Sequence, residues 1–269
     1  MASVRSAAGA AGLFGAGTVT NLPSVVAWAE RPHTAGMAPT HPSSGSAARR
    51  PLEAVVFDLD GVLIEGEEVW DAVRQGLVRA RGGHWVPGAT AAMMGMSSPE
   101  WSRYMAEELG VPMAPAAIIA ETVAGVAARY EEALPLVPGA VGVVRELAQH
   151  WPLGLASSAN RPIIELVLDR AGLTGCFRAT VSSEEVARGK PAPDVYLEVA
   201  RRLGVAADRC AAVEDSANGL RSAAAARMWV VAVPNRRYPP PPELVQAADL
   251  VVATVRELTP AAIGGLGRG

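Results

Sequence analysis

Lysine is almost absent from this chain of 269 residues. Of its 24 basic residues only Lys190 is a lysine, and all the others are arginines. Because arginine serves wherever a generic positive charge suffices, the exception indicates a position that needs a compact ammonium group close to a phosphate or a carboxylate. The alternative is chance, since a single lysine must fall somewhere. The lysine therefore needs support from a second pattern.

Cysteine and long apolar runs are also scarce. The two cysteines, Cys176 and Cys210, have neither metal-ligand nor Cys-x-x-Cys spacing, so we expect reduced core thiols in a cytoplasmic protein, with a disulfide or redox role as the lesser alternative. No run is long enough to span a membrane. A net charge of −3 and scattered arginines predict no binding to nucleic acid. The 50% hydrophobic content suffices for one sizeable core with a smaller domain.

Acidic residues are nearly missing from residues 1–50, which contain only Glu30 and are crowded with alanine, glycine, serine, proline and threonine. Such a composition has too little apolar periodicity to form a packed element. Three interpretations stay open: an organellar transit peptide, a weak secretory signal ending near Ala27-Trp28-Ala29, and a disordered extension that precedes a start at Met37. We favour the extension, because the pattern of a folded protein begins only at Leu52.

From Leu52 onward, short apolar runs alternate with amphipathic segments. This alternation predicts an α/β fold, a Rossmann-like parallel sheet with helices on both faces. The expected strands are 54–57, 153–156, 179–182, 210–214, 229–233 and 249–252, and the expected core helices are 162–171, 193–203 and 217–226.

One interval, from Leu63 to Pro138, contains no strand pattern. It shows helical periodicity at 67–81, 99–108 and 115–134. We therefore expect a helical cap at 66–137, inserted into a core formed by 51–65 and 138–260. Such a cap can close over residues that follow the first strand, exclude water and select the substrate.

Polar residues follow three of the expected strands. Asp58 and Asp60 follow the first, Ser157 the second, and Glu214 and Asp215 end another. In parallel sheets such groups gather at the carboxyl edge. A carboxylate held in line can attack a phosphate monoester and form an aspartyl phosphate, so Asp58 is the candidate nucleophile. Repulsion between the anions requires cations, and the Asp58, Asp60 and Asp215 set favours Mg²⁺.

Four stretches resemble, in order, the four motifs of the haloacid dehalogenase-like hydrolase superfamily: 57–63 (FDLDGVL), 155–158 (LASS), 189–194 (GKPAPD) and 213–216 (VEDS). The resemblance extends from about residue 52 to about residue 252, and is greatest for the phosphatase and β-phosphoglucomutase branch with a helical cap. A single motif is unspecific, because Asp-x-Asp-Gly also occurs in turns and calcium loops. Four motifs in the right order, each after an expected strand, are specific.

The resemblance implies that Asp58 and Asp215 coordinate Mg²⁺ through their carboxylates and that Asp60 does so through its backbone carbonyl. The Asp60 side chain then remains free to protonate the leaving oxygen and to take a proton from the attacking water. Glu214 is expected to support the metal from outside its ligand shell.

Three further groups are expected to bind the phosphate. Lys190 is expected to neutralise the phosphate and Asp58, while the Ser157 hydroxyl and the Ser158 backbone N–H bind phosphate oxygens. Structural alternatives exist: Ser157 and Asp215 can be helix caps, Asp60-Gly61 a turn, and Lys190 a solvated loop charge. Taken together, these structural alternatives are less convincing, because unrelated capping and turn residues are not expected to match the full residue set of one phosphoryl-transfer site.

The remaining candidates lie outside the motifs. The histidines are expected to be structural or surface residues, and the tryptophans and methionines of the cap to pack in its interior, with a few against substrate. They are His33, His41, His84, His150, Trp70, Trp85, Met93, Met94, Met96 and Trp101.

Departures from relatives narrow the expected reaction. The Asp60 carboxyl argues against dehalogenation, and the lack of a cap lysine argues against Schiff-base chemistry. Trp70 and Ser98 stand where mutases of this branch carry a histidine and a phosphate-gripping arginine, and the 64–67 hinge lacks the Asp-Ser-Glu run of many relatives. We predict a Mg²⁺-dependent phosphatase of a small phosphorylated metabolite, a monomer or weak homodimer. The alternatives are a sugar phosphomutase and a non-catalytic binding protein on the same fold.

Overall fold

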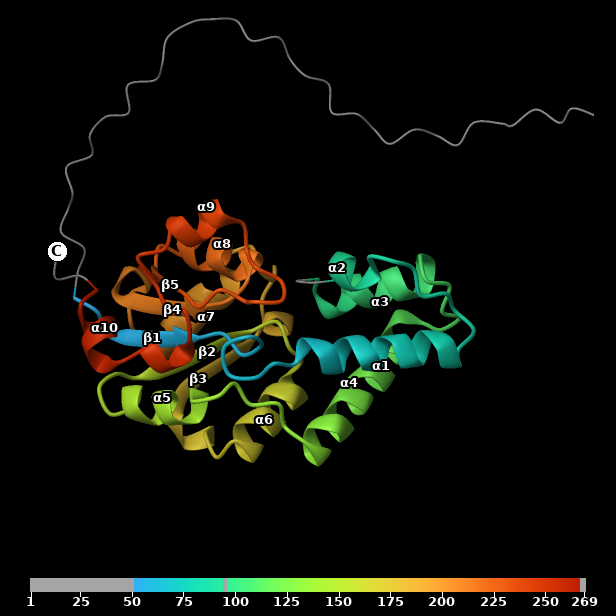
Figure 1. Ribbon diagram of the computed structural model, residues 1–269, viewed down its shortest axis with the longest axis horizontal. Coiled ribbons are helices and arrows are strands. Elements are labelled where there is room, and N and C mark those ends of the chain that lie inside the picture. The colour runs from blue at the N-terminus through green and yellow to red at the C-terminus, as the bar shows by residue number, and fades with distance from the viewer. Residues whose placement is uncertain (1–50, 94–95, 267–269) are drawn as a thin grey trace, which may run out of the picture. The chain divides into compact units, whose positions relative to one another are not determined.

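A single parallel sheet organises the chain in the computed structural model, which describes residues 51–93 and 96–266 (Figure 1). Its strand order is β3-β2-β1-β4-β5-β6, and all neighbouring strands are parallel. The predicted α/β fold is confirmed. The strands are β1 (Ala54–Phe57), β2 (Leu153–Ser157), β3 (Phe177–Ser182), β4 (Cys210–Glu214), β5 (Trp229–Ala232) and β6 (Leu250–Val251).

Helices cover both faces of the sheet. Side chains alternate along a strand, so Val55 and Phe57 pack into one buried cluster with α5 and α6, while Ala54 and Val56 pack into a second cluster with α7 and α8. Figure 1 shows α5 and α6 on one side of the sheet and α8 and α9 on the other. These helices are α5 (Ala140–Leu147), α6 (Arg161–Arg170), α7 (Asp194–Leu203), α8 (Ala217–Ala225), α9 (Pro242–Gln246) and α10 (Pro260–Gly264).

In the described residues between β1 and α5 there are four helices. They are α1 (Glu67–Ala80), α2 (Ala89–Met93), α3 (Ser98–Glu107) and α4 (Pro115–Glu132). The Trp70 and Trp101 rings meet edge to face inside this group, with centroids 6.3 Å apart. Apart from single bridges at Ile64, the described residues of this interval form no strand pairs. The boundaries of the cap at 66 and 137 stay a prediction.

The two linkers that join this helical group to the sheet pair with each other. The Glu65 N–H donates to the Pro135 carbonyl at 2.8 Å, and the Val137 N–H donates to the Leu63 carbonyl at 2.9 Å. Because the two linkers are hydrogen-bonded to each other, they cannot easily slide apart. The helical group can move relative to the sheet more easily by bending of the paired linkers.

Some predictions fall outside the described residues, namely those on residues 1–50, including His33 and His41, and on Met94. Within 51–93 and 96–266, no helix combines the length and the apolar character needed to cross a bilayer. Both cysteines are free thiols; Cys210 is buried, and Cys176 is half-buried against the core.

Candidate active site

The polar residues predicted to act together lie at the carboxyl ends of neighbouring strands. Phe57, the last residue of β1, pairs in register with Leu155 and Val213, so β1, β2 and β4 end within two residues of one another. Asp58 therefore emerges between Ser157 and Glu214, and all three side chains are buried. The loop after β4 continues into Asp215, which is also buried.

Lys190 reaches this edge from the loop that precedes α7. Its Nζ lies 2.6 Å from Asp58 Oδ1, 2.6 Å from Glu214 Oε1 and 3.1 Å from the Ala156 carbonyl. Only 4% of its side chain is exposed, which excludes a solvated loop charge. Burial opposes the charge of this ammonium, but the two carboxylates outweigh burial and raise the pKa of Lys190. The single lysine thus joins three strand ends through three hydrogen bonds.

Glu214 has a partner that the sequence did not reveal. The Tyr196 hydroxyl on α7 donates to Glu214 Oε1 at 2.6 Å, and both side chains are fully buried. Gly219 at the start of α8 makes room for this carboxylate, because a Cβ there would lie 1.8 Å from Glu214 Oε2. Tyr196 occupies the apolar face of an amphipathic helix, so its spacing predicts core packing and gives no functional signal.

Three carboxylates at this edge can hold a cation. Ligand atoms of Asp58, Glu214 and Asp215 lie within 4.8 Å of one another, and one ammonium faces them. Burial raises the pKa of Asp58 to about 8, with Lys190 opposing and Glu214 adding to the effect, and burial also raises the pKa of Asp215. Buried carboxylates in excess of their counter-charge, all with oxygen ligands, fit a hard divalent cation such as Mg²⁺.

The Asp215 carboxylate is fixed from two sides. Asn235, in the loop after β5, donates from Nδ2 to Asp215 Oδ2 at 2.8 Å. The helix that follows is capped by Ser216, whose Oγ accepts the Gly219 N–H at 3.1 Å, so Asp215 is not the cap of α8. Asn235 also follows an apolar strand run, and the rule that found Asp58 would have found it.

Gly61 forms the other wall around Asp215. Its φ is +81°, and a Cβ there would lie 1.8 Å from Asp215 Oδ2. We expect Gly61→Ala to displace this carboxylate, lower the rate of phosphate release about tenfold or more, and raise the Mg²⁺ concentration needed for activity. Gly82→Ala is the matched control, because Gly82 has φ +76° with nothing within 4 Å of the added Cβ.

Both alanine variants should lose about 1 kcal/mol of stability from the left-handed backbone. Titration of phosphate release with Mg²⁺ separates this shared cost from the effect on Asp215. If Gly61→Ala behaves like Gly82→Ala, Asp215 has no part in the reaction.

Asp60 faces the cap rather than the cation cluster. Its Oδ1 is buried and has no hydrogen-bond partner in the described part of the chain. Burial raises the pKa of Asp60 to about 7, and the nearby Glu67 carboxylate adds to this effect. A carboxyl group with such a pKa is suited to exchange a proton near neutral pH.

A cavity of about 120 Å³ lies between Asp60 and the cap. From the sheet side it is lined by Asp60 and residues 158–160, so the half-buried Ser158 borders it. From the cap it is lined by Glu67, Trp70, Asp71, Arg74, Thr90, Met93, Met96 and Trp101. The expectation that some cap tryptophans and methionines face substrate therefore concerns Trp70, Met93, Met96 and Trp101. Trp85 is partly buried elsewhere, and His84 and His150 are exposed.

Arg74 is the basic residue of this lining, and no motif pointed to it. Its guanidinium lies 5.1 Å from the Trp70 ring centroid and 4.8 Å from that of Trp101. Burial lowers its pKa to about 10, and Asp71 and Asp60 oppose this shift, so the group stays charged at neutral pH.

The hydroxyl oxygens of Ser157 and Ser98 each accept a hydrogen bond from a neighbouring residue. Ser157 Oγ accepts the Ala159 N–H at 3.0 Å, whereas the cap position of α6 is held by Asn160. The Ser157 hydroxyl proton therefore stays available to a ligand. Asn160 Nδ2 donates to the buried Ser98 Oγ at 3.1 Å, which ties the start of α3 to the sheet edge.

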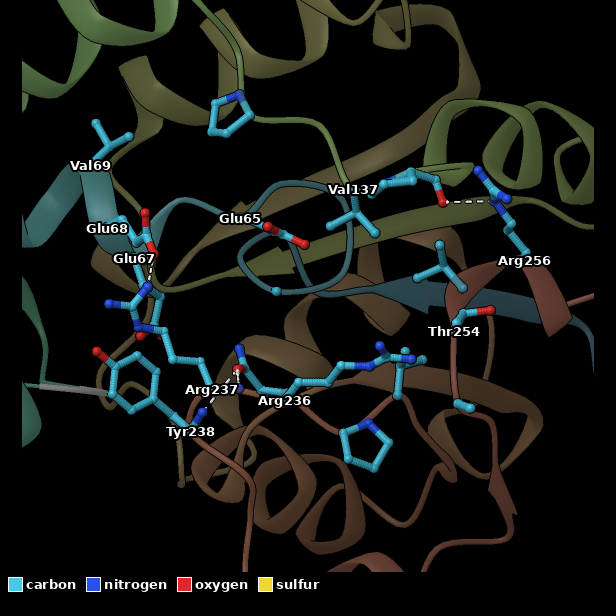
Figure 2. Close-up of a pocket in the computed structure, with 18 residues that line it drawn as sticks. Glu65, Glu67, Glu68, Val69, Val137, Arg236, Arg237, Tyr238, Thr254 and Arg256 are labelled. Atoms are coloured by element: carbon cyan, nitrogen blue, oxygen red, sulfur yellow. Dashed lines mark hydrogen bonds and ion pairs between the residues drawn. The ribbon is translucent and has the colours of Figure 1, made fainter.

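A second and larger cavity, of about 680 Å³, lies beside the linkers (Figure 2). Figure 2 shows Glu65 and Val137 from the two linkers on one side and Arg236 on the other. An ion pair between Arg237 and Glu68 of α1 borders it. None of the predicted site residues lines this cavity, whereas Asp60 and Ser158 line the smaller one.

Comparisons with known proteins agree with the motifs and the fold. The family model for the haloacid dehalogenase-like hydrolases matches residues 52–227. Hexitol phosphatase B of Escherichia coli (strain K12) is 32% identical over 218 residues, which cover 78% of this chain and 96% of that protein.

Many solved structures share the fold, and two of them serve as examples. CbbY from Rhodobacter sphaeroides in complex with phosphate has a TM-score of 0.71 and 26% identity, covering 79% of this chain and 99% of that one. The β-phosphoglucomutase of Clostridium difficile has a TM-score of 0.68 at 22% identity, covering 79% and 95%, and shows likeness of fold alone. As the four motifs predict, this chain is an enzyme that belongs to the haloacid dehalogenase-like hydrolases.

Proposed function

We propose that the protein is a Mg²⁺-dependent phosphatase that hydrolyses a small phosphorylated metabolite through an aspartyl phosphate on Asp58. The observation that carries this proposal is the contact of Lys190 with Asp58 and Glu214, beside Asp215 and at the carboxyl edge of the sheet. A generic structural charge has no need of two buried carboxylates on one ammonium, with a third carboxylate beside them. A non-catalytic binding protein would have no use for a buried Asp60 carboxyl group whose Oδ1 has no hydrogen-bond partner in the described part of the chain.

In the first step, an Asp58 carboxylate oxygen attacks phosphorus, and the bond between phosphorus and the ester oxygen breaks. Asp60 donates its proton to the departing oxygen. Lys190 balances the negative charge of the phosphoryl group, while the Ser157 hydroxyl and the Ser158 N–H donate to its oxygens. The product alcohol leaves, and the phosphoryl group stays on Asp58.

In the second step, water attacks phosphorus and gives a proton to Asp60, which returns the acid to its starting state. The bond between Asp58 and phosphorus breaks, and inorganic phosphate leaves. Mg²⁺, held by Asp58, Asp215 and the Asp60 carbonyl with Glu214 in support, would neutralise charge on the phosphoryl oxygens when bound.

The substrate class that we propose is a sugar or sugar-alcohol phosphate. The cavity above Asp60 is small, about 120 Å³, and combines the Trp70 and Trp101 rings with polar groups of Asp71, Thr90 and Asn160. The apolar ring atoms that reach the cavity suit the carbon skeleton of a polyol, and the polar groups suit its hydroxyls. The relationship to a hexitol phosphatase supports the same class.

A sugar phosphomutase is the second candidate, and Arg74 is the observation that favours it. This cap arginine lines the cavity above Asp60 and can hold an anionic group of a bound sugar phosphate. Against it, the positions at which mutases of this branch carry a histidine and an arginine are Trp70 and Ser98, and Ser98 is engaged with Asn160. The expected cytoplasmic location and the monomeric or weakly dimeric state stay predictions.

Release of phosphate distinguishes the two candidates. With Mg²⁺ and a panel of hexose and hexitol phosphates, we expect steady release of inorganic phosphate, no activation by a sugar bisphosphate, and loss of activity on chelation of the metal. Colorimetric phosphate assays and chromatography of the sugar products make the measurement. Isomerisation of a hexose monophosphate faster than phosphate release would establish the mutase instead.

A further inference from the structure

Two buried oxygens approach the same point at the hinge of the cap. A Cβ added to Gly66 would lie 2.3 Å from Asp60 Oδ1 and 2.3 Å from the Tyr130 hydroxyl oxygen. The two oxygens are therefore separated by no more than twice this distance. Gly66 is buried, belongs to the first linker and precedes α1, whereas Tyr130 lies near the end of α4, just before the second linker.

Neither oxygen makes a hydrogen bond of normal geometry in the part of the chain that the structure describes. The Trp70 indole N–H interacts weakly with the Tyr130 hydroxyl and opposes the rise in its pKa that burial causes. Tyr130 is fully buried, so water does not satisfy its hydroxyl from the surface. Leaving buried polar atoms unpaired is costly, and a hydroxyl donor beside a carboxylate acceptor is a complementary pair. A rotation of the Asp60 side chain, or a small bend of the paired linkers, is sufficient to join them.

We propose that Tyr130 is a positioning residue for the general acid and base: its O–H donates to Asp60 Oδ1 and directs the other carboxyl oxygen towards the leaving group. The inference rests on the role of Asp60 under the proposed function. Tyr130 touches no substrate atom in this scheme. It links the seating of the cap, through α4, to the orientation of the proton carrier.

Gly66 makes the arrangement possible. Its φ of −77° and ψ of −23° are ordinary helical values, so alanine fits the backbone there, and the added methyl group alone would push Asp60 and Tyr130 apart. The Asp60 and Tyr130 oxygens occupy the space that a Cβ at position 66 would need. The proposed pair therefore requires glycine at this position. No other role for this glycine follows from its backbone angles.

Tyr130→Phe and Gly66→Ala test the inference against matched controls. Tyr104→Phe removes a hydroxyl from α3 in the same cap, and Gly76→Ala adds a methyl group on α1 with nothing within 4 Å. With glucose 6-phosphate as substrate, we expect kcat to fall about tenfold or more in Tyr130→Phe and in Gly66→Ala, with KM within about twofold. Both controls should match the wild type.

A second readout separates positioning from a general packing role. p-Nitrophenyl phosphate has a leaving group that departs without a proton, so a misplaced Asp60 should spare the first step and slow hydrolysis of the aspartyl phosphate. Rapid mixing should then show a burst of p-nitrophenolate close to one equivalent per enzyme in Tyr130→Phe, larger than in the wild type. A packing defect would lower burst and steady rate together, and that result would overturn the inference.

Asp60→Asn separates the two levels of the proposal. If it keeps the wild-type rate, the proposed function of Asp60 fails, and the inference fails with it. If Asp60→Asn is impaired while Tyr130→Phe and Gly66→Ala are normal, only the inference fails. Impairment of all three, with the burst in Tyr130→Phe, supports both.

Discussion

Asp58→Asn is expected to abolish turnover, with loss of phosphate release below detection and no aspartyl phosphate. An amide oxygen is a poor nucleophile and cannot form the acyl phosphate, so neither chemical step has a substitute. Incubation with substrate and Mg²⁺, followed by acid quenching and mass spectrometry of the intact protein, measures the phosphoenzyme directly. The wild type should show the mass of one added phosphoryl group, and the variant none.

The fold should survive this substitution. Burial already disfavours the charge of Asp58 by raising its pKa to about 8, and Lys190 keeps Glu214 as a partner 2.6 Å away. We therefore expect a thermal midpoint close to that of the wild type. Asp208→Asn, the same chemical change at an exposed position, is the control and should leave activity unchanged. Turnover by Asp58→Asn at the native rate would refute the assignment of the nucleophile.

The elements follow from the sequence where apolar periodicity is continuous. The strand predicted at 210–214 coincides with β4, and the helices predicted at 67–81 and 193–203 match α1 and α7 within one residue. The strand β3 begins at Phe177, two residues before the predicted run, because the exposed Arg178 interrupts the apolar pattern. The helix α5 is not predicted, because its eight mostly apolar residues also fit a buried strand.

The residues of the site also include some that the sequence predicts and some that it does not. Asp58 and Lys190 are predictable because motifs record the types of residue that phosphoryl transfer requires, and their contact at 2.6 Å links positions 132 apart. Tyr196 and Tyr130 are not predictable, because each occupies a buried helix position where an apolar residue would give the same spacing. Packing brings the Tyr196 hydroxyl to Glu214 and places the Tyr130 hydroxyl near Asp60, and neither arrangement can be read from the spacing.

The contact between Gly61 and Asp215 can be predicted from the sequence only in part. The sequence shows a glycine after Asp60, which predicts a turn. The reason for glycine has two parts, a positive φ and a carboxylate 1.8 Å from the place of the missing Cβ. The first part is local and can be anticipated, whereas the second depends on the register between β1 and β4 and appears only in three dimensions.

Lys190→Arg is expected to lower turnover about a hundredfold or more, nearly as far as Lys190→Ala. The ammonium donates to three acceptors, at 2.6, 2.6 and 3.1 Å, on the ends of β1, β4 and β2. A compact group with three tetrahedral donors fits this arrangement, whereas a planar guanidinium is wider and directs its donors differently. The loss corresponds to removing a preorganised electrostatic contact to a transition state. Steady-state phosphate release with Mg²⁺ measures it.

The free energies of unfolding of Lys190→Ala and Lys190→Arg distinguish the effect of the lysine charge from the effect of its shape. Lys190→Ala leaves the buried carboxylates without their ammonium and should lower the free energy of unfolding by about 3 kcal/mol, an effect that Mg²⁺ partly offsets. Lys190→Arg keeps the positive charge and should lose less stability while losing almost as much activity. Arg188→Lys, the reverse exchange at a side chain that is 70% exposed, should change neither quantity. Near-normal turnover in Lys190→Arg would mean that any cation suffices, and that chance explains the single lysine of the chain.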